Sequence, residues 1–109
     1  MAEKIIKRGE IYWVNFDPTI GTEIKKIRPA LIIFSSFHRV IVLPITSNIQ
    51  EVHDWQLIIK GLVKNRDGKI LFDQMRSFDK QRLLRNIGQI NQSEINQVNQ
   101  ILKKMLIQI

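Results

Sequence analysis

The sequence has 109 residues, which is enough for one compact hydrophobic core and too short for a second, so we expect a single domain over residues 1–109. It carries 17 lysine and arginine residues against 10 acidic ones, and the formal charge of +7 favours an anionic partner such as RNA, DNA or an acidic peptide, or serves solubility alone. The chain has no cysteine, which excludes disulfides, thiolate nucleophiles and cysteine zinc sites, and no apolar run approaches the roughly 18 residues of a membrane span.

The first part of the chain is typical of short strands. Glu10–Phe16 alternates aromatic and β-branched residues with polar ones, which predicts a strand. The apolar runs Ala30–Phe34 and Val40–Ile45 follow, and we interpret them as neighbouring central strands. Asn65–Gly68 is predicted to be a turn, because Asp-Gly supplies the positive φ of tight hairpins. Further strands are predicted at Trp55–Ile59 and Lys69–Phe72.

Patterns typical of helices come late in the chain. Asp79 is placed to cap a short helix over Lys80–Arg85, and Gly88 ends the segment that follows it. Ser93 is the expected N-cap of a longer terminal helix with one buried face. Its apolar residues, three and four apart, are Ile95, Val98, Ile101, Leu102, Met105, Leu106 and Ile109. Short strands followed by a terminal helix predict an α+β fold, in which the helix packs on a strongly curved antiparallel sheet or barrel.

Arg28 stands where a polar loop meets a buried strand. Pro29 restricts Arg28 to an extended conformation, and the preceding loop carries two lysines. If the two central strands form a hairpin, Arg28 lies beside Thr46 and Ser47, because the start of one antiparallel strand faces the end of the next. A guanidinium and hydroxyl groups there would bind a phosphate and stabilise charge that develops on it. Ordinary turn chemistry explains the same residues equally well, and Asp73 can simply pair with Arg76, so both interpretations stay open.

Other chemistries have little support in the sequence. His38 and His53 are 15 positions apart and lack the paired spacing of metal ligands, so we expect no metal site. The glycine motifs of P-loop NTPases, Rossmann enzymes and α/β-hydrolases are absent from the sequence. We therefore expect no cofactor.

Five parts of the chain carry a family resemblance. They are Arg8–Tyr12, Asp17-Pro18 with Gly21-Thr22-Glu23, Lys26–Ile33, Pro44–Ser47, and Asp73–Ser77 with Asp79–Leu83. In this order they resemble the MazF/PemK toxin endoribonucleases of bacterial type II toxin–antitoxin pairs. Each part alone is weakly diagnostic, but five in register are specific. The resemblance implies a small SH3-like antiparallel β-barrel with a short helix and a C-terminal amphipathic helix, as in MazF, Kid and CcdB, and a homodimer.

The resemblance also implies an activity and its residues. Members cleave single-stranded RNA, including mRNA, at short sequences without a metal, and leave 2′,3′-cyclic phosphate and 5′-hydroxyl ends. The family's key arginine and threonine fall on Arg28 and Thr46, and its acidic residues on Glu23 and Asp73. We expect Arg28 to stabilise charge, since arginine is a poor proton donor. The general base is open between Glu23 and Asp73.

Polar residues around these four are expected to bind RNA. They are Gly21, Thr22, Lys25, Lys26, Ser47, Asn48, Gln74 and Arg76. Thr22 and Leu71 stand where some relatives carry a histidine and an arginine, so an acid–base scheme built on that pair does not apply here.

The implied partners are single-stranded RNA and an antitoxin with a disordered acidic tail, and both agree with the charge of +7. The N-terminal sequence lacks the long apolar region of a secretory signal, so we expect a cytoplasmic protein with no membrane association. Two alternatives remain. One is a non-enzymatic, CcdB-like toxin that binds DNA gyrase. The other is an inactive RNA-binding barrel, although the few aromatic residues, mostly in predicted strands, suggest no base-stacking platform.

Overall fold

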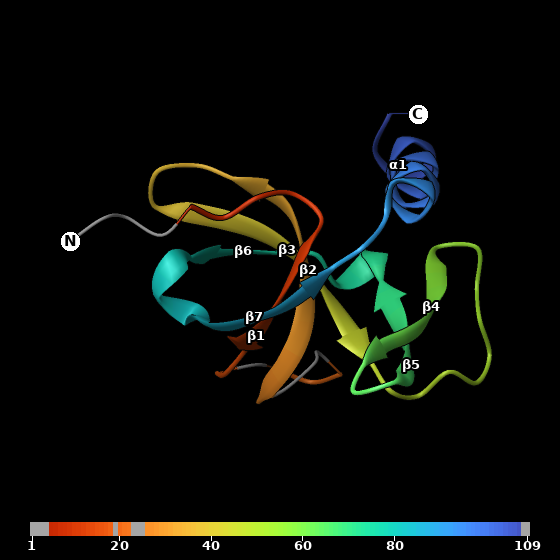
Figure 1. The fold of residues 1–109 in the computed structure, drawn as a ribbon, viewed down its shortest axis with the longest axis horizontal. Helices are drawn as coiled ribbons and strands as arrows, with labels where there is room; N and C mark the ends of the chain where they lie inside the picture. Colours follow the sequence, from red (N-terminus) through yellow and green to blue (C-terminus); the bar gives the residue numbers. More distant parts are fainter. Residues whose placement is uncertain (1–4, 19, 23–25, 108–109) are drawn as a thin grey trace.

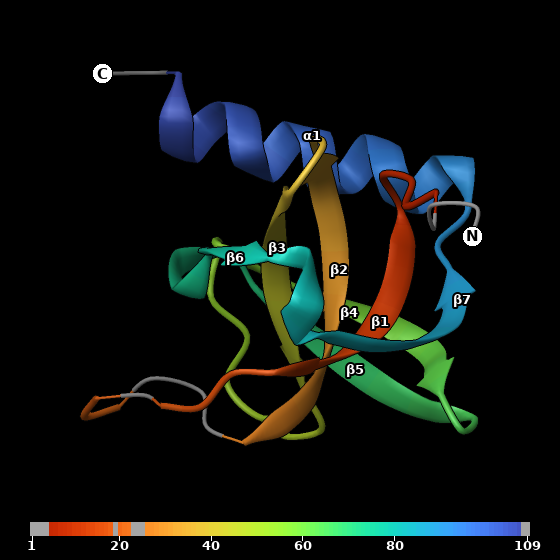
Figure 2. The same cartoon turned by 90° about the vertical axis from the view of Figure 1, so that its left-hand side faces the viewer.

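A strongly curled antiparallel sheet forms most of the structure, a computed structural model that describes residues 5–18, 20–22 and 26–107 (Figure 1). One helix lies across one end of the strands (Figure 2). The elements in chain order are β1 (Glu10–Asn15), β2 (Ile27–Ser35), β3 (Arg39–Thr46), β4 (Gln56–Val63), β5 (Arg66–Leu71), the 3₁₀ turn η1 (Phe72–Gln74), β6 (Arg76–Asp79), the 3₁₀ turn η2 (Lys80–Arg82), β7 (Leu83–Gln89) and α1 (Gln92–Leu106). The predicted α+β class, a strongly curved antiparallel sheet with a C-terminal helix, is confirmed, and the sheet has the form of a half-barrel.

The curl of the sheet is centred on β3. The strand order is β4-β5-β3-β2-β1-β7, and β6 pairs with β3 off this path. The first half of β3 pairs with β6, whereas Ile45 and Thr46 at its end pair with β5. Because β3 gives one edge to two partners in succession, the sheet turns there.

Both faces of the central strands are buried. Neighbouring residues of β1, such as Ile11 and Tyr12, therefore enter different clusters, since successive side chains point to opposite faces. One cluster contains Tyr12, Val14, Phe16, Ala30, Ile32, Val40, Val42 and Phe78. The other contains Ile11, Leu31, Leu43, Ile45, Ile59, Ile70, Phe72, Ile90 and Val98, and α1 covers it.

The terminal helix is confirmed, but its N-cap is Asn91, two residues before the predicted Ser93. The Asn91 side chain accepts a hydrogen bond from the Glu94 N–H, and the Glu94 carboxylate accepts one from the Asn91 N–H, both at 2.8 Å. This reciprocal capping box leaves Ser93 inside the helix. Of the predicted apolar face, Val98 is buried and Leu106 is 59% exposed, so only the first turns of α1 cover the core. Ile109 lies outside the described residues.

The predicted short helix over Lys80–Arg85 is wrong beyond Arg82. Asp79 does accept a hydrogen bond from the Gln81 N–H, at 2.8 Å, but the helical turn ends after three residues. From Leu83 the chain is extended as β7, because it pairs with β1.

The predicted turn at Asn65–Gly68 is also displaced. Lys64 and Asn65 make the turn, with φ of 51° and 62°, and join β4 to β5. Gly68 lies within β5, where a Cβ would stand 2.7 Å from Ile45 Cγ2. Asp67 accepts a hydrogen bond from the Gly61 N–H at 3.0 Å, across an irregularity in the ladder. The Asp-Gly pair thus serves close packing and a bulge rather than the turn.

Candidate functional site

Arg28 and Thr46 line one groove of about 560 Å³ at the end of β2 and β3. Ala30 lies opposite Pro44 in the antiparallel ladder, and the same register continued by two residues places Arg28 opposite Thr46. The predicted proximity of Arg28, Thr46 and Ser47 is therefore confirmed. The lining is completed by Trp13, Ile27, Pro29, Ile45, Val63, Lys64, Arg66, Asp67 and Gly68.

The far wall of this groove adds positive charge that we did not assign to the site from the sequence. Lys64 and Arg66 come from the β4–β5 hairpin, and both are exposed. The one carboxylate in the wall, on Asp67, accepts the Gly61 N–H. The groove therefore holds more cations than anions and favours an anionic ligand. The sequence does indicate that this region is basic, because lysine and arginine residues are concentrated between positions 60 and 85.

Trp13 forms an aromatic wall of the groove. It is half-buried in β1, opposite Pro29 of β2 on one side and Arg85 of β7 on the other. A second hollow of about 260 Å³, lined by Arg85, Asn86 and Ile87, shares Trp13, Val63 and Lys64 with the groove. The groove thus continues past an aromatic ring toward β7. Trp13 is a strand residue, as expected from the sequence, and the structure adds that it borders this groove.

The Thr46 hydroxyl accepts one hydrogen bond from the local backbone and can still donate one. Its Oγ1 accepts the Asn48 N–H at 3.2 Å, and the Asn48 side chain accepts the Gln50 N–H at 3.1 Å. A hydroxyl that accepts in this way still has its own proton to donate. Asn48 lines neither the groove nor the pocket described next, so the structure supports its turn role.

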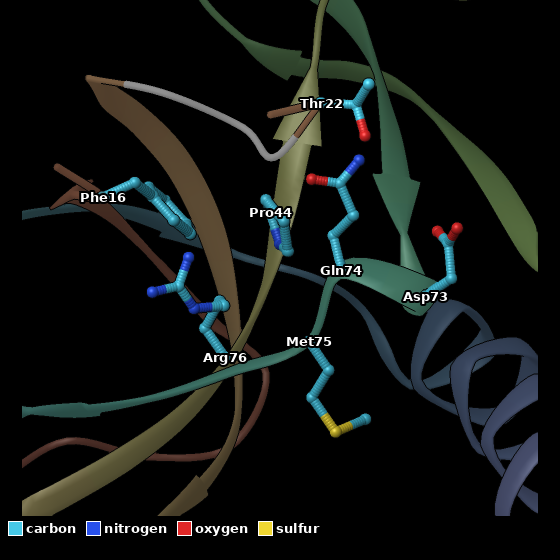
Figure 3. A pocket seen from close by; sticks show the side chains of 7 residues that line it. All are labelled: Phe16, Thr22, Pro44, Asp73, Gln74, Met75 and Arg76. Atoms are coloured by element: carbon cyan, nitrogen blue, oxygen red, sulfur yellow. The ribbon is translucent and has the colours of Figure 1, made fainter. Parts of the chain in front are cut away.

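Four further predicted site residues gather in a separate pocket of about 310 Å³ (Figure 3). They are Thr22, Asp73, Gln74 and Arg76, with Phe16, Pro44 and Met75 completing the lining. Figure 3 shows the Gln74 amide between Pro44 and Thr22, with the Arg76 guanidinium near Phe16. Pro44 lines this pocket and its neighbour Ile45 lines the groove, so the end of β3 separates the two cavities. The predicted site is therefore divided in two.

Arg76 is held in its pocket by an aromatic ring. Its guanidinium lies 4.8 Å from the centre of the Phe78 ring, and Phe78 meets Phe16 edge-on at 5.3 Å. A guanidinium over an aromatic face is stabilised by the electrons of the ring.

The start of the β1–β2 loop is hydrogen-bonded to the 3₁₀ turn η2, which precedes β7. Arg82 donates to the carbonyl oxygens of Asn15, at 3.1 Å, and of Asp17. The Asp17 carboxylate accepts the Lys26 N–H at 2.8 Å, which closes the loop on itself. Gly21, Thr22 and Lys26 are exposed in this loop, whereas Glu23 and Lys25 lie outside the described residues.

Within the described ranges, no three His, Cys, Asp or Glu side chains lie together in a way that would hold a metal ion. In the same ranges no helix is long and apolar enough to cross a membrane.

The sequence of residues 7–106 matches the family of PemK-like, MazF-like toxins of type II toxin–antitoxin systems. This chain belongs to that family. The endoribonuclease MazF9 of Mycobacterium tuberculosis is 32% identical to it, over 91% of this chain and 94% of the relative. The endoribonuclease EndoA of Bacillus subtilis is 31% identical, over 91% and 92%.

Solved structures of the MazF fold superpose on this chain. MazF of Deinococcus radiodurans has a TM-score of 0.82 at 22% identity, covering 95% of this chain and 98% of the other. A mycobacterial endoribonuclease in complex with its cognate antitoxin has a TM-score of 0.75 at 16% identity, covering 94% and 95%. The resemblance to MazF/PemK toxins and the expected MazF fold are thus confirmed, and the gyrase-binding alternative is not favoured.

Proposed function

We propose that this MazF/PemK family member is the toxin of a type II toxin–antitoxin pair and cleaves single-stranded RNA, including mRNA, at specific sequences without a metal. One observation carries the proposal: Arg28, Thr46 and Ser47 line a single cationic groove with an aromatic wall. Curated relatives that match nearly the whole chain are named endoribonucleases, which supports the same activity here.

The reaction is an internal transfer at phosphorus. The ribose 2′-oxygen forms a bond to the adjacent phosphorus and the bond to the 5′-oxygen breaks, so the products are a 2′,3′-cyclic phosphate and a 5′-hydroxyl. One proton leaves the 2′-hydroxyl for a base, and the departing 5′-oxygen takes up one proton from the protonated base or from water. Arg28 stabilises the negative charge that develops on the phosphoryl oxygens through two parallel N–H donors. The Thr46 hydroxyl donates a hydrogen bond to one of those oxygens.

The base is Glu23 or Asp73. Asp73 is exposed and lines the Thr22 pocket, which the end of β3 separates from the groove. Asp73 can therefore act as the base only for an RNA that crosses the end of β3. Glu23→Gln and Asp73→Asn distinguish the two candidates. The substitution that replaces the base should remove the acid limb of the pH profile of kcat/KM, and the other substitution should leave the shape of the profile intact.

The cationic groove also suits an acidic antitoxin segment, which would block RNA entry by occupying the same surface. This partner is consistent with the mycobacterial endoribonuclease that was solved with its cognate antitoxin. We further propose a homodimer and a cytoplasmic location, where mRNA is available as substrate.

The test is cleavage of a long RNA by the purified protein in EDTA, with chemical analysis of the ends. We expect cuts at a defined short sequence with 2′,3′-cyclic phosphate and 5′-hydroxyl ends. Arg28→Ala should lower kcat by roughly 10²–10³-fold, the typical loss on removing a donor that stabilises a developing oxyanion. Arg39→Ala is the matched control, because Arg39 is exposed at the opposite end of β3 and donates to Ser77. RNA left equally intact by the wild type and by Arg28→Ala contradicts the proposal.

A further inference from the structure

Lys69 is a buried cation that the proposed reaction does not use. It is 6% exposed, the one charged side chain that the described part of the chain buries. It lies in β5 directly opposite Thr46 of β3. Three residues next to it, Arg66, Asp67 and Gly68, line the Arg28 groove.

The ammonium group of Lys69 is directed at the backbone of the β3–β4 loop, which we define as residues 47–55. Its Nζ donates to the Gln50 carbonyl at 2.9 Å and to the Glu51 carbonyl at 3.5 Å. Glu51 has a φ of 53°, a conformation that costs a non-glycine residue free energy. The strained residue therefore lies where the chain presents two successive carbonyls to one cation.

Each end of the loop has its own local bonds. At the start, Asn48 N–H donates to Thr46 Oγ1. At the end, His53 N–H donates to Gln56 Oε1 and Gln56 N–H to the His53 carbonyl, both at 3.0 Å. The Lys69 bonds lie between these ends and connect the middle of the loop to the sheet.

Burying an ammonium group is unfavourable unless polar partners replace its water. An apolar side chain of similar length would fill the same volume in β5 without that cost. The hydrogen bonds of Lys69 to the Gln50 and Glu51 carbonyls therefore explain why a lysine stands at this buried position.

The loop carries aromatic side chains of the kind that stack on unpaired bases. His53 and Trp55 stack with ring centres 4.7 Å apart and planes 5° from parallel, and Trp55 is 41% exposed. Exposed aromatic faces bind single-stranded bases by stacking. Ser47 both lines the groove and begins the loop, so the arrangement of the loop backbone is coupled to the groove through Ser47.

We propose that Lys69 is a positioning residue, which holds the β3–β4 loop in one arrangement beside the groove and thereby sets the bases accepted next to the cut. This role rests on the proposed RNA cleavage. Lys69 acts through the loop backbone and touches no reacting atom.

The test compares Lys69→Met and Lys69→Gln, which remove the long-range donor in an apolar and a polar form, with Lys69→Arg, which keeps a cationic donor. Lys60→Met is the charge-matched control, because Lys60 is exposed on the neighbouring strand β4. Amide exchange of residues 48–55 should rise roughly tenfold in Lys69→Met, the factor for one hydrogen bond to a charged group. It should stay near the wild-type value in Lys69→Arg and Lys60→Met.

Cleavage of a randomised single-stranded RNA pool measures the consequence. In Lys69→Met the sequence preference should broaden and KM should rise roughly tenfold while kcat stays within about twofold, since lost preorganisation weakens binding. Lys69→Arg should restore the wild-type preference, a result that a purely structural role would not produce. Lys69→Gln supplies the same comparison if the Met variant does not fold.

Two results overturn the inference. One is unchanged loop exchange in the folded Met or Gln variant, and the other is an unchanged sequence preference despite faster exchange. A wild-type protein that cuts no RNA instead overturns the proposed function, and with it the role in base selection. The exchange measurement then still decides whether Lys69 anchors the loop.

Discussion

At the scale of single residues, Tyr12 shows how the core constrains a polar group. It is the only tyrosine of the chain and is 1% exposed, in the cluster beneath β1 and β2. Burial raises the pKa of its phenol above the ordinary value of 10.0. The hydrogen bond with Asn86 acts in the lowering direction, and the Glu10 carboxylate adds to the rise.

This shift predicts a loss of stability in alkali. Above a pH of about 10 the unfolded chain releases the phenolic proton while the folded chain keeps it, so the unfolded state binds fewer protons and stability falls as pH rises. The contribution is fully present below that pH and disappears as pH rises through the folded pKa. Urea unfolding of the wild type and of Tyr12→Phe over this range checks the prediction.

Tyr12→Phe should show a shallower loss of unfolding free energy in alkali, because it has no phenol to titrate. The ultraviolet absorbance of tyrosinate gives an independent measure, since it reports Tyr12 alone. A native protein whose tyrosinate signal appears at the same pH as in the denatured chain contradicts the shift.

The sequence predicted some site residues and missed others for a definite physical reason. The proximity of Arg28 and Thr46 could be predicted, because a single hairpin between adjacent strands brings them together and the local pattern indicates that hairpin. The place of Trp13 and Arg66 in the groove could not be predicted in this way. They line it together only because β1 and the β4–β5 hairpin, about 50 residues apart in the chain, lie on its two sides. Alternation in β1 identified Trp13 as a strand residue but gave no information about the cavity beside it.

At the scale of elements, the helix boundary predicts that substitutions at Asn91 and Ser93 differ in their effect on stability. Asn91 makes both bonds of the capping box with Glu94, whereas Ser93 is already helical. Asn91→Ala should lower the free energy of unfolding by about 1 kcal/mol, and Ser93→Ala by much less. Urea denaturation of the two variants measures the difference. Equal losses contradict the assigned cap.

Elements formed by local bonds were easier to predict than those formed by pairing. The periodicity of α1 and the Asp79 cap are readable within a few residues. By contrast, Leu83–Gln89 has no strong preference of its own and becomes a strand because the edge of β1 is available. Likewise Gly68 is fixed by its approach to Ile45 of β3, a contact that no local pattern predicts.

At the scale of the whole molecule, charge and shape divide the protein into two ends. The groove with Arg28, Lys64 and Arg66 lies at the end of the sheet formed by the start of β2 and the β4–β5 hairpin. α1 crosses the opposite end (Figure 2), and its exposed lysines, Lys103 and Lys104, stand there. The net charge is therefore less informative than its position, because both ends carry cations, whereas the groove lined by Arg28 and Thr46 lies at one of them.

This division predicts how RNA binding depends on salt. Each cation that contacts a phosphate of a single strand contributes about 0.7 to the slope of log affinity against log salt concentration, because a counterion is released. Arg66→Gln should therefore reduce the slope by about 0.7. Lys104→Gln removes the same charge from the helix end and should leave the slope unchanged, although it lowers the net charge equally. The measurement is titration of a single-stranded RNA with a 2′-deoxy nucleotide at the cut, which binds without reacting. Equal slopes for the two variants would mean that total charge, and not the groove, attracts the RNA.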